Sequence, residues 1–525
     1  MRFIGIICSA ILAVLSSSKA QETIECSLDH VQNYRNNSDY SVILQEMIDE
    51  ASRLQNPVVY LDAGIFIIDP ENPIILRPGV SLRGSLDLPT IISVNDRNNT
   101  GAILVYNDNQ GWSIQDIVFE NVNIQVKENT NENETAIFSN LFFNGGRGSI
   151  LAQNGERLFI DGNIFLRDEL HAGQERLPTF NGTNAGIMFQ AQKNSIVSNN
   201  IFGMDLRKMD NLEQVIRPQL ERPFRNLRFM HQCLGRNISD EQGYLASGVQ
   251  LYSTVDITIK ENIMNATFPD TKFIAQDHAV SVVGSNQTYV YQNFIAGWQI
   301  YDFGGAIRFT SAVDGYVISN YLANTGVMMY VATHADFEQV SNIVVHKNML
   351  YKFFGHDVAP VSEELNGWLY EGITFFDFYT ARVNNTILPP IWNSSVPISP
   401  WGWHIVISDN RFGASEGLDP NIISLGNLDL AEAYVDRKNC YVTEPFNGNT
   451  SSAVVPLLWR QSFQQDQYTR YGARIPQDTA QYTDNDLNNQ IPAQFRNLYI
   501  PNFWRAFVLK NDTIPMLDPE IPCYI

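Results

Sequence analysis

The sequence predicts an all-β solenoid, in which short parallel strands stack coil upon coil along one axis. A motif of alternating apolar residues followed by asparagine recurs along the chain, and a second alternating strand precedes it at a fixed distance. No helical apolar pattern separates these strands, which argues against a fold that alternates strands with helices.

The recurring motif is an alternating apolar strand, then asparagine, then another short apolar strand. It reads "NSIVSNNIFG", "VDITIKENIMN", "QTYVYQNFIA", "DGYVISNYLA", "SNIVVHKNML" and "WHIVISDNRFG". The marker asparagines are Asn200, Asn262, Asn293, Asn320, Asn348 and Asn410, and the series extends backwards to Asn163 and Asn121. Asparagine suits a tight bend because it tolerates left-handed backbone, and stacked amides can hydrogen-bond between coils. We therefore expect these asparagines to be structural and not catalytic.

A second strand precedes four of the markers at a constant distance. The first residues of these strands, each fourteen residues before its marker, are Gly186, Gly248, Ala279 and Ala306. The gaps between successive markers vary from 27 to 62 residues, so one cross-section repeats while loops of different length are inserted. The two longest gaps predict excursions over about residues 203–246 and 351–403.

Both ends of the solenoid are expected to be covered. The stretch "SDYSVILQEMIDEASRL" has apolar residues at helical spacing, with Ser38 or Asp39 as the N-cap, and predicts a helix that closes the first coil. Residues 441–525 are irregular and rich in Gln, Pro and aromatic residues. We expect them to cover the last coil.

The first twenty residues predict export. They carry Arg2, an apolar core from Phe3 to Leu15 and small residues near Ala20, which is the pattern of a cleaved secretory signal. The core is too short to span a membrane. The chain is therefore expected to be extracellular, and N-x-S/T sequons between Asn36 and Asn511 suit a glycoprotein.

The charge restricts the partners. The formal net charge of −21 becomes −23 when Arg2 and Lys19 leave with the signal. A chain this acidic is a poor ligand for nucleic acid or anionic membrane. A polyanionic substrate would need local cations or Ca²⁺.

The cysteines predict two disulfides. Cys8 leaves with the signal, and the mature chain keeps Cys26, Cys233, Cys440 and Cys523. Three pairings are open, and an elongated solenoid favours Cys26–Cys233 with Cys440–Cys523. The spacing has no metal-site pattern, so no resident metal or cofactor is expected.

The motifs resemble a known superfamily. The cap helix, the "VVYLDAGIFII" and "VSLRGS" strands and the "I-x-V-x-x-N-x-F" coils are similar to the right-handed parallel β-helix proteins of the pectin-lyase-like superfamily, over residues 39–440. The resemblance implies a right-handed parallel β-helix over residues 21–440 with an N-terminal capping helix and an irregular C-terminal cap. It implies no single activity, because the superfamily includes lyases, hydrolases, epimerases, tailspikes and non-catalytic surface proteins.

The resemblance implies that substrate lies along the strand that heads each coil. Stacking these strands by the constant offset predicts two exposed columns of outward side chains. The first column is Gln250, Ser281, Arg308, Met328 and Thr374, and the second is Tyr252, Val283, Thr310, Tyr330 and Phe376. Arg308 in such a column can pair with a carboxylate or sulfate, or else bridge to an acid of its own chain.

Four residues at this face are the candidates for catalysis: Asp277, His278, Asp302 and Arg308. The offset of one coil and two residues would separate the two aspartates by roughly 8 Å, which suits an inverting glycosidase. His278 is alternatively a general base. The alternative is a structural role, in which these side chains lie at a polar corner and hydrogen-bond to the loop backbone. The candidates for substrate binding are Gln250, Tyr252, Tyr330, His334 and Asp377.

A basic stretch, "RPQLERPFRNLRF", could oppose an acidic substrate or pair with the chain's own acids. The "NxD", "DD", "GHG" and "RxK" set of polygalacturonases and the "DPHD" of mannuronan epimerases are missing. The sequence therefore predicts a monomeric, secreted enzyme for a cell-wall or matrix polysaccharide, either a lyase or epimerase of uronates or an inverting hydrolase. The alternative is a non-catalytic glycan-binding or structural protein.

Overall fold

The computed structural model describes most of the chain between residues 39 and 500. The described residues are 39–54, 57–96, 99–106, 110–128, 135–167, 185–204, 218–235, 245–265, 278–298, 305–331, 340–352, 372–377, 402–414, 423–425, 433–435, 439–442, 458–459 and 491–500.

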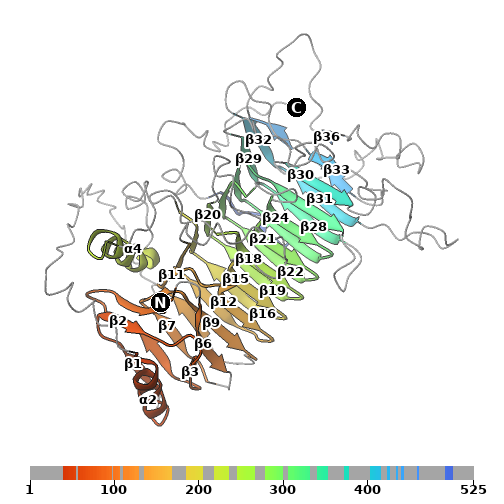
Figure 1. The fold of residues 1–525 in the computed structure, drawn as a ribbon. Helices are drawn as coiled ribbons and strands as arrows, with labels where there is room; N and C mark the ends of the chain where they lie inside the picture. The colour runs from red at the N-terminus through yellow and green to blue at the C-terminus, as the bar shows by residue number, and fades with distance from the viewer. Residues whose placement is uncertain are drawn as a thin grey trace, which may run out of the picture.

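Three parallel sheets of twelve strands each run along the molecule (Figure 1), and each coil contributes one strand to each sheet. Sheet 1 contains β1 (Val58–Tyr60), β4 (Ser81–Arg83), β7 (Ser113–Gln115), β10 (Thr135–Phe138), β13 (Leu158–Asp161), β16 (Lys193–Ser198), β19 (Val255–Lys260), β22 (Asn286–Tyr291), β25 (Val313–Ile318), β28 (Val340–His346), β31 (Gly402–Ser408) and β34 (Ala433–Val435). Sheet 2 contains β2 (Gly64–Ile67), β5 (Thr90–Ser93), β8 (Ile117–Glu120), β11 (Leu141–Phe143), β14 (Ile164–Leu166), β17 (Ile201–Phe202), β20 (Ile263–Asn265), β23 (Phe294–Ala296), β26 (Tyr321–Ala323), β29 (Met349–Lys352), β32 (Arg411–Ala414) and β35 (Cys440–Tyr441). Sheet 3 contains β3 (Ile74–Leu76), β6 (Gly101–Tyr106), β9 (Val122–Lys127), β12 (Gly148–Gln153), β15 (Ala185–Gln190), β18 (Ser247–Tyr252), β21 (His278–Val283), β24 (Gly305–Thr310), β27 (Val327–Val331), β30 (Ile373–Asp377), β33 (Ile423–Leu425) and β36 (Leu458–Trp459). This architecture confirms the predicted right-handed parallel β-helix.

A ladder of buried asparagines holds the bend between sheets 1 and 2. Its members are Asn140, Asn163, Asn200, Asn262, Asn293, Asn320, Asn348, Asn410 and Asn439. The Oδ1 of Asn293, for example, accepts from the backbone N–H of Asn262 at 2.9 Å and from its Nδ2 at 3.0 Å. The Nδ2 of Asn293 in turn donates to the carbonyl of Ile259 at 2.9 Å and to the Oδ1 of Asn320 at 3.0 Å. The predicted stacking of amides is confirmed, with the same geometry across short and long gaps.

Two details of the predicted bends were wrong. The left-handed backbone belongs to the residue before each marker, such as Asn199 (φ 54°) or Lys347 (φ 53°), because the marker's side chain must turn into the bend to reach the next coil. Asn121 lies instead between β8 and β9, where its Nδ2 donates to the carbonyl of Val94 at 3.3 Å. The ladder position of that coil is held by Ile117, whose N–H donates to the Oδ1 of Asn140 at 3.1 Å.

The interior is a continuous apolar core in which equivalent side chains stack between coils. Phe119, Phe142, Phe165 and Phe202 form a row of stacked rings with centroids 4.8 to 5.0 Å apart. All four rings are fully buried in the core. The strand spacing of a parallel sheet, about 4.8 Å, matches the spacing that offset-stacked rings require.

The helix α2 (Ser41–Ala51) closes the first coil, as predicted (Figure 1). Its Leu44 and Ile48 are buried in the solenoid core. The carboxylate of Asp39 accepts hydrogen bonds from the Ser41 N–H at 2.8 Å and from its hydroxyl at 2.7 Å, and these bonds lower the pKa of Asp39. Asp39 therefore supplies the cap, although Tyr40 is the residue at the N-cap position.

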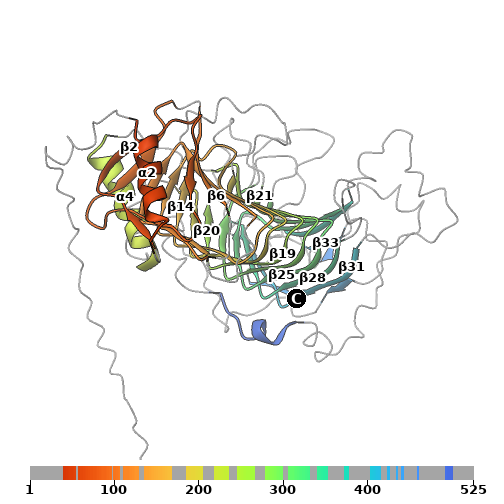
Figure 2. The same ribbon diagram turned by 90° about the horizontal axis from the view of Figure 1, so that it is seen from below.

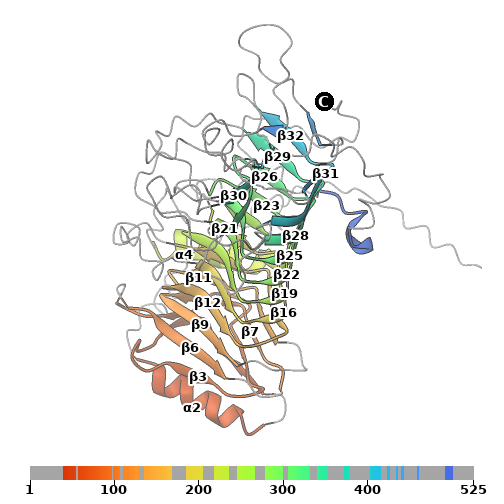
Figure 3. The same cartoon turned by 90° about the vertical axis from the view of Figure 1, so that its right-hand side faces the viewer.

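The short 3₁₀ helix η7 (Ala493–Phe495) lies beside sheet 1 (Figures 2 and 3). The Phe495 ring lies 5.4 Å from the rings of both Tyr289 and Tyr291. The Nζ of Lys347 donates to the Arg496 carbonyl at 2.7 Å, and the Nε2 of Gln292 donates to the Tyr499 carbonyl at 2.8 Å. Residues 491–500 thus strap the side of the solenoid, and the cover of the last coil by the rest of residues 441–525 stays a prediction.

Replacing Asn293 by alanine should destabilise the protein. The substitution leaves two buried donors of Asn262 without their acceptor, and the expected loss is about 3 kcal/mol in the free energy of unfolding. Urea denaturation followed by circular dichroism measures it. The control Asn72→Ala removes an exposed hydrogen bond from the Asn72 side-chain amide to Asp69 and should change the free energy of unfolding by less than about 0.5 kcal/mol. Equal effects of the two substitutions would contradict the role of the ladder.

Candidate functional site on the third sheet

The predicted register of sheet 3 is confirmed. β18, β21, β24, β27 and β30 pair in parallel and place equivalent residues side by side. The register aligns Gln250, Ser281, Arg308, Met328 and Thr374 in the first column, and Tyr252, Val283, Thr310, Tyr330 and Phe376 in the second. Neighbouring members of a column are separated by one strand spacing, about 4.8 Å.

Hydrogen bonds connect the polar members of this face. The Nη2 of Arg308 donates to the hydroxyl of Ser281 on the preceding coil at 2.9 Å. One coil further back, the Nε2 of Gln250 donates to the Ser247 hydroxyl at 3.0 Å, and the Tyr252 hydroxyl donates to Gln250 Oε1 at 3.4 Å. These lateral bonds fix the orientation of the guanidinium and of the amide, as a site that recognises a ligand requires.

The expectation that the whole face is exposed was wrong. Gln250, Ser281 and Met328 are 2%, 1% and 1% exposed, although they point away from the core. Only Tyr252 and Arg308 among the polar members of the two columns are partly exposed where the structure describes their side chains. Strand alternation indicates which side of the sheet a residue occupies, but it carries no information on what covers that side.

His278 is fully buried. It begins β21 in register with Gly305. Ala279 and Val280 both belong to the core, so the alternation shifts by one residue there. Ser247, which occupies the position equivalent to His278 on the preceding coil, bonds the outward Gln250 three residues on. His278 begins β21 three residues before Ser281, whose partner in register on the next coil is Arg308.

The remaining predicted site residues have no described side chains. Asp277, Asp302 and His334 lie outside the described residues, and for Tyr330 and Asp377 the structure describes only the backbone. The separation of the two aspartates and their proposed acid and base roles stay predictions.

Two residues of the face were missed as functional candidates. Ser247 holds the Gln250 amide, and the constant offset that relates it to His278 could have found it. Thr310 is 6% exposed, and its Oγ1 has no hydrogen-bond partner among the described residues. It lies two residues after Arg308 on the same face of β24, and no sequence signal distinguished it from a packing threonine.

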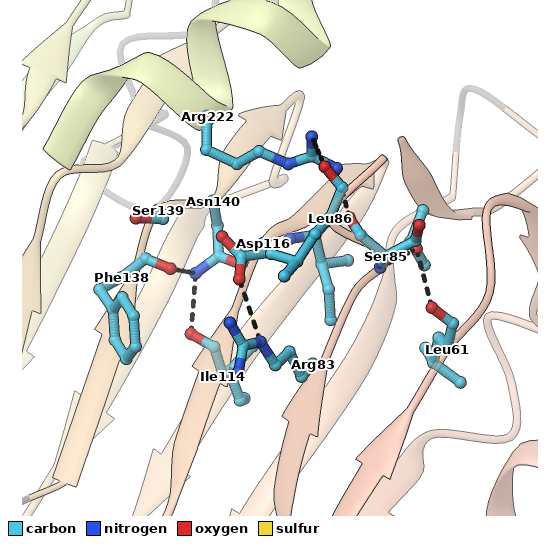
Figure 4. Close-up of polar contacts among 12 residues, drawn as sticks. Leu61, Arg83, Ser85, Leu86, Ile114, Asp116, Phe138, Ser139, Asn140 and Arg222 are labelled. Carbon is cyan, nitrogen blue, oxygen red and sulfur yellow. Dashed lines mark hydrogen bonds and ion pairs between the residues drawn. The ribbon is translucent and has the colours of Figure 1, made fainter. Parts of the chain in front are cut away.

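A second polar cluster lies at the bends of sheets 1 and 2 (Figure 4). Asp116 connects β7 to β8 with left-handed backbone (φ 61°), and its Oδ2 lies 3.4 Å from the Nε of Arg83. Burial raises the pKa of the Asp116 carboxyl above its usual value, while the guanidinium groups of Arg83 and Arg222 offset part of the rise. The cluster joins elements of the scaffold and is not an open site.

Arg222 belongs to the helix α4 (Pro218–Gln232), which packs its apolar side on sheet 2. Its guanidinium donates to the carbonyls of Ser85, of Leu86 at 2.6 Å and of Leu88 at 3.2 Å (Figure 4). This cation of the basic stretch therefore binds backbone carbonyls of the scaffold.

The sheets, the capping helix and the polar columns define a right-handed parallel β-helix protein with one candidate site on sheet 3. Within the described ranges, no group of three or more His, Cys, Asp or Glu side chains is arranged to bind a metal. No helix in the described part of the chain is long and apolar enough to cross a membrane.

No protein-family model matches the chain, and no curated protein matches it. Among solved structures, the surface adhesin PfbA of Streptococcus pneumoniae is 12% identical with a TM-score of 0.40, covering 78% of this chain and 88% of its own. The A-module of the mannuronan C-5 epimerase AlgE4 of Azotobacter vinelandii is 12% identical with a TM-score of 0.33, covering 81% and 99%. The family 28 exopolygalacturonase of Yersinia enterocolitica is 10% identical with a TM-score of 0.32, covering 78% and 73%. Similarities this distant carry no argument on function, and the fold rests on the three sheets themselves.

Replacing Arg222 by methionine should loosen α4. The helix loses its hydrogen bonds to three backbone carbonyls, and the expected cost is about 2 kcal/mol. Faster amide hydrogen exchange in α4 measures the loosening. Arg225→Met, at an exposed position of the same helix, is the control and should leave the exchange unchanged.

The same variant should depend on pH in a defined direction. Without Arg222 the pKa of Asp116 rises further in the folded state, so the folded protein favours the protonated acid more strongly. The stability deficit of Arg222→Met relative to wild type should therefore be smallest near pH 3 and grow as the pH rises through the carboxyl range. A deficit that shrinks with rising pH, measured by urea denaturation, would contradict the role of Arg222 beside Asp116.

Proposed function

We propose that this protein is a secreted carbohydrate-active protein that acts on a uronate-containing polysaccharide at the outward face of sheet 3. The observation that carries the proposal is Arg308, a partly exposed arginine whose guanidinium is held by the Ser281 hydroxyl in the middle of the first column. Arginine recognises carboxylates through paired N–H donors. A uronate carboxylate is the group of a polysaccharide that such a side chain would select.

The neighbours of Arg308 support lyase or epimerase chemistry over hydrolysis. Both reactions remove the C5 proton next to the carboxylate, and pairing with Arg308 would stabilise the negative charge that develops there. In elimination, the electron pair then forms the C4–C5 double bond, and the glycosidic oxygen leaves C4 and takes a proton. In epimerisation, a proton returns to C5 from the opposite side.

Two residues are proposed for the proton transfer. Tyr252 is partly exposed and its hydroxyl is oriented by Gln250, which suits a group that must meet the substrate. His278 lies closer to Arg308 in register but is fully buried, so its proposed role is to support the Ser281 and Arg308 pair. Hydrolysis by Asp277 and Asp302 is the second enzymatic route, and it depends on two residues outside the described ranges.

A non-catalytic glycan-binding role is the alternative function. The observation that favours it is the burial of Gln250, Ser281 and His278, which leaves few polar groups of this face open to a substrate. Binding needs only the partly exposed Arg308 and Tyr252, whereas catalysis needs a base in contact with C5.

The location, glycosylation, oligomeric state and cofactor requirement of the protein are also proposed. Export follows from the signal-like residues 1–20, and glycosylation from the sequons. We propose a monomer without a resident cofactor, in which Ca²⁺, where it is needed, bridges the acidic substrate to a chain of formal charge −21.

Replacing Arg308 by glutamine should abolish action on uronate polymers. The expected loss in kcat/KM is 10²-fold or more, about 3 kcal/mol of transition-state stabilisation. Arg308→Lys keeps the charge but not the paired donors, and its kcat/KM should lie between those of the wild type and of Arg308→Gln. Arg53→Gln removes an exposed cation of the first-coil region and is the charge-matched control. Full activity of Arg308→Gln would contradict the proposed site.

The assay uses purified protein with a panel of uronate and neutral polysaccharides, with and without Ca²⁺ and a chelator. Absorbance of unsaturated uronates with new reducing ends means elimination, and an NMR change in uronate configuration means epimerisation. Reducing ends alone mean hydrolysis and would overturn the preferred mechanism. Binding by calorimetry without any turnover would select the alternative function.

A further inference from the structure

We propose that two disulfides, Cys26–Cys233 and Cys440–Cys523, tie the segment before the capping helix to helix α4 and the segment after the strap to the last coil. Cys233 and Cys440 are each disulfide-bonded, and both lie on described elements, Cys233 just after α4 and Cys440 at the start of β35. The assignment of their partners follows from distances along the axis, which the stacking of coils fixes.

Cys233 and Cys440 are too far apart to bond to one another. The helix α4 packs on β8, β11 and β14, in the third to fifth coils, and Cys233 joins the apolar cluster beneath it. Cys440 lies on β35, seven strands beyond β14 in sheet 2. At a strand spacing of about 4.8 Å this is roughly 34 Å, whereas the Cα atoms of a disulfide lie about 4.4 to 6.8 Å apart.

The chain before α2 is too short to bring Cys26 to Cys440. Asp39 pairs with Ile67 of β2, which fixes that residue at the first coil. Thirteen peptide units separate Cys26 from Asp39, and a chain of this length reaches at most about 47 Å when fully extended. β35 lies eleven strands from β2, about 53 Å along the axis alone.

Only a perfectly straight chain along the whole solenoid would approach that separation. A random coil of thirteen residues has an average span of about 20 Å, and this distance is enough to reach the coils beneath α4. Cys233 is therefore the partner of Cys26. With Cys8 removed in the proposed signal, Cys440 is left with Cys523, which follows the strap at residues 491–500 by a segment long enough to reach the last coil.

The bonds require an oxidant of the secretory pathway. Each pair of thiols gives two electrons and two protons to a protein or glutathione disulfide, which is reduced to two thiols as the new S–S bond forms. The first bond would fasten the segment before the capping helix to α4. The second would fasten the C-terminal segment to the twelfth coil. The inference is independent of the proposed activity.

The test is a peptide map of the full secreted chain. The protein is alkylated without reduction, treated with an endoglycosidase and digested with trypsin, which places the four cysteines on separate peptides. Mass spectrometry should find the Cys26 and Cys233 peptides joined, and the Cys440 and Cys523 peptides joined. A Cys26–Cys440 or Cys233–Cys523 species, or an alkylated Cys233, would overturn the assignment.

Two single substitutions provide a second readout. Cys26→Ser should leave Cys233 open to alkylation and the Cys440–Cys523 bond intact, and Cys523→Ser should do the converse. Alkylation of Cys440 in Cys26→Ser would overturn the pairing. If either variant is not secreted, the map of the wild-type chain still decides, because it needs no substitution.

Discussion

The hydrogen bond from one asparagine to the next is the interaction on which the solenoid depends. From Asn163 onward each ladder Oδ1 accepts from the backbone N–H and from the Nδ2 of the asparagine on the preceding coil, and each Nδ2 donates to a carbonyl. The polar groups at the bend are thereby hydrogen-bonded in a fully buried position, where an unpaired amide would destabilise the fold. Because the bonds join coils and not neighbouring residues, partners 27 or 62 residues apart are held at the same distances.

The fold could be predicted from the sequence because the repeat has a fixed internal length. The fourteen residues from Gly248 to Asn262, or from Ala306 to Asn320, set the cross-section and also the register of sheet 3. The site could be predicted only in part. Its columns follow from this offset. The burial of Gln250 and Ser281 depends instead on the residues that pack over the sheet, and these follow no periodic pattern in the sequence. The shift in alternation at Ala279 and Val280, which both lie in the core, could not be predicted from the sequence either.

The outer faces of the three sheets differ in the described elements that cover them. Sheet 2 is covered by α4 through an apolar cluster and the carbonyl contacts of Arg222. Sheet 1 receives the strap at residues 491–500, where Phe495 rests on a tyrosine pair. Sheet 3 carries Arg308, whose guanidinium is held by the Ser281 hydroxyl. Contacts of α4 and of the strap therefore occupy two faces, and the proposed site lies on the third.

The asparagine bend also has a consequence for where the molecule can vary. From β7 to β32 the turn from sheet 1 to sheet 2 contains one or two residues. Every large excursion, such as the one between β17 and β18 or between β30 and β31, lies at one of the other two edges. Those two edges border sheet 3. New loops can thus be acquired on both sides of that face without disturbing the stack, and its specificity is free to evolve while the opposite edge stays constant.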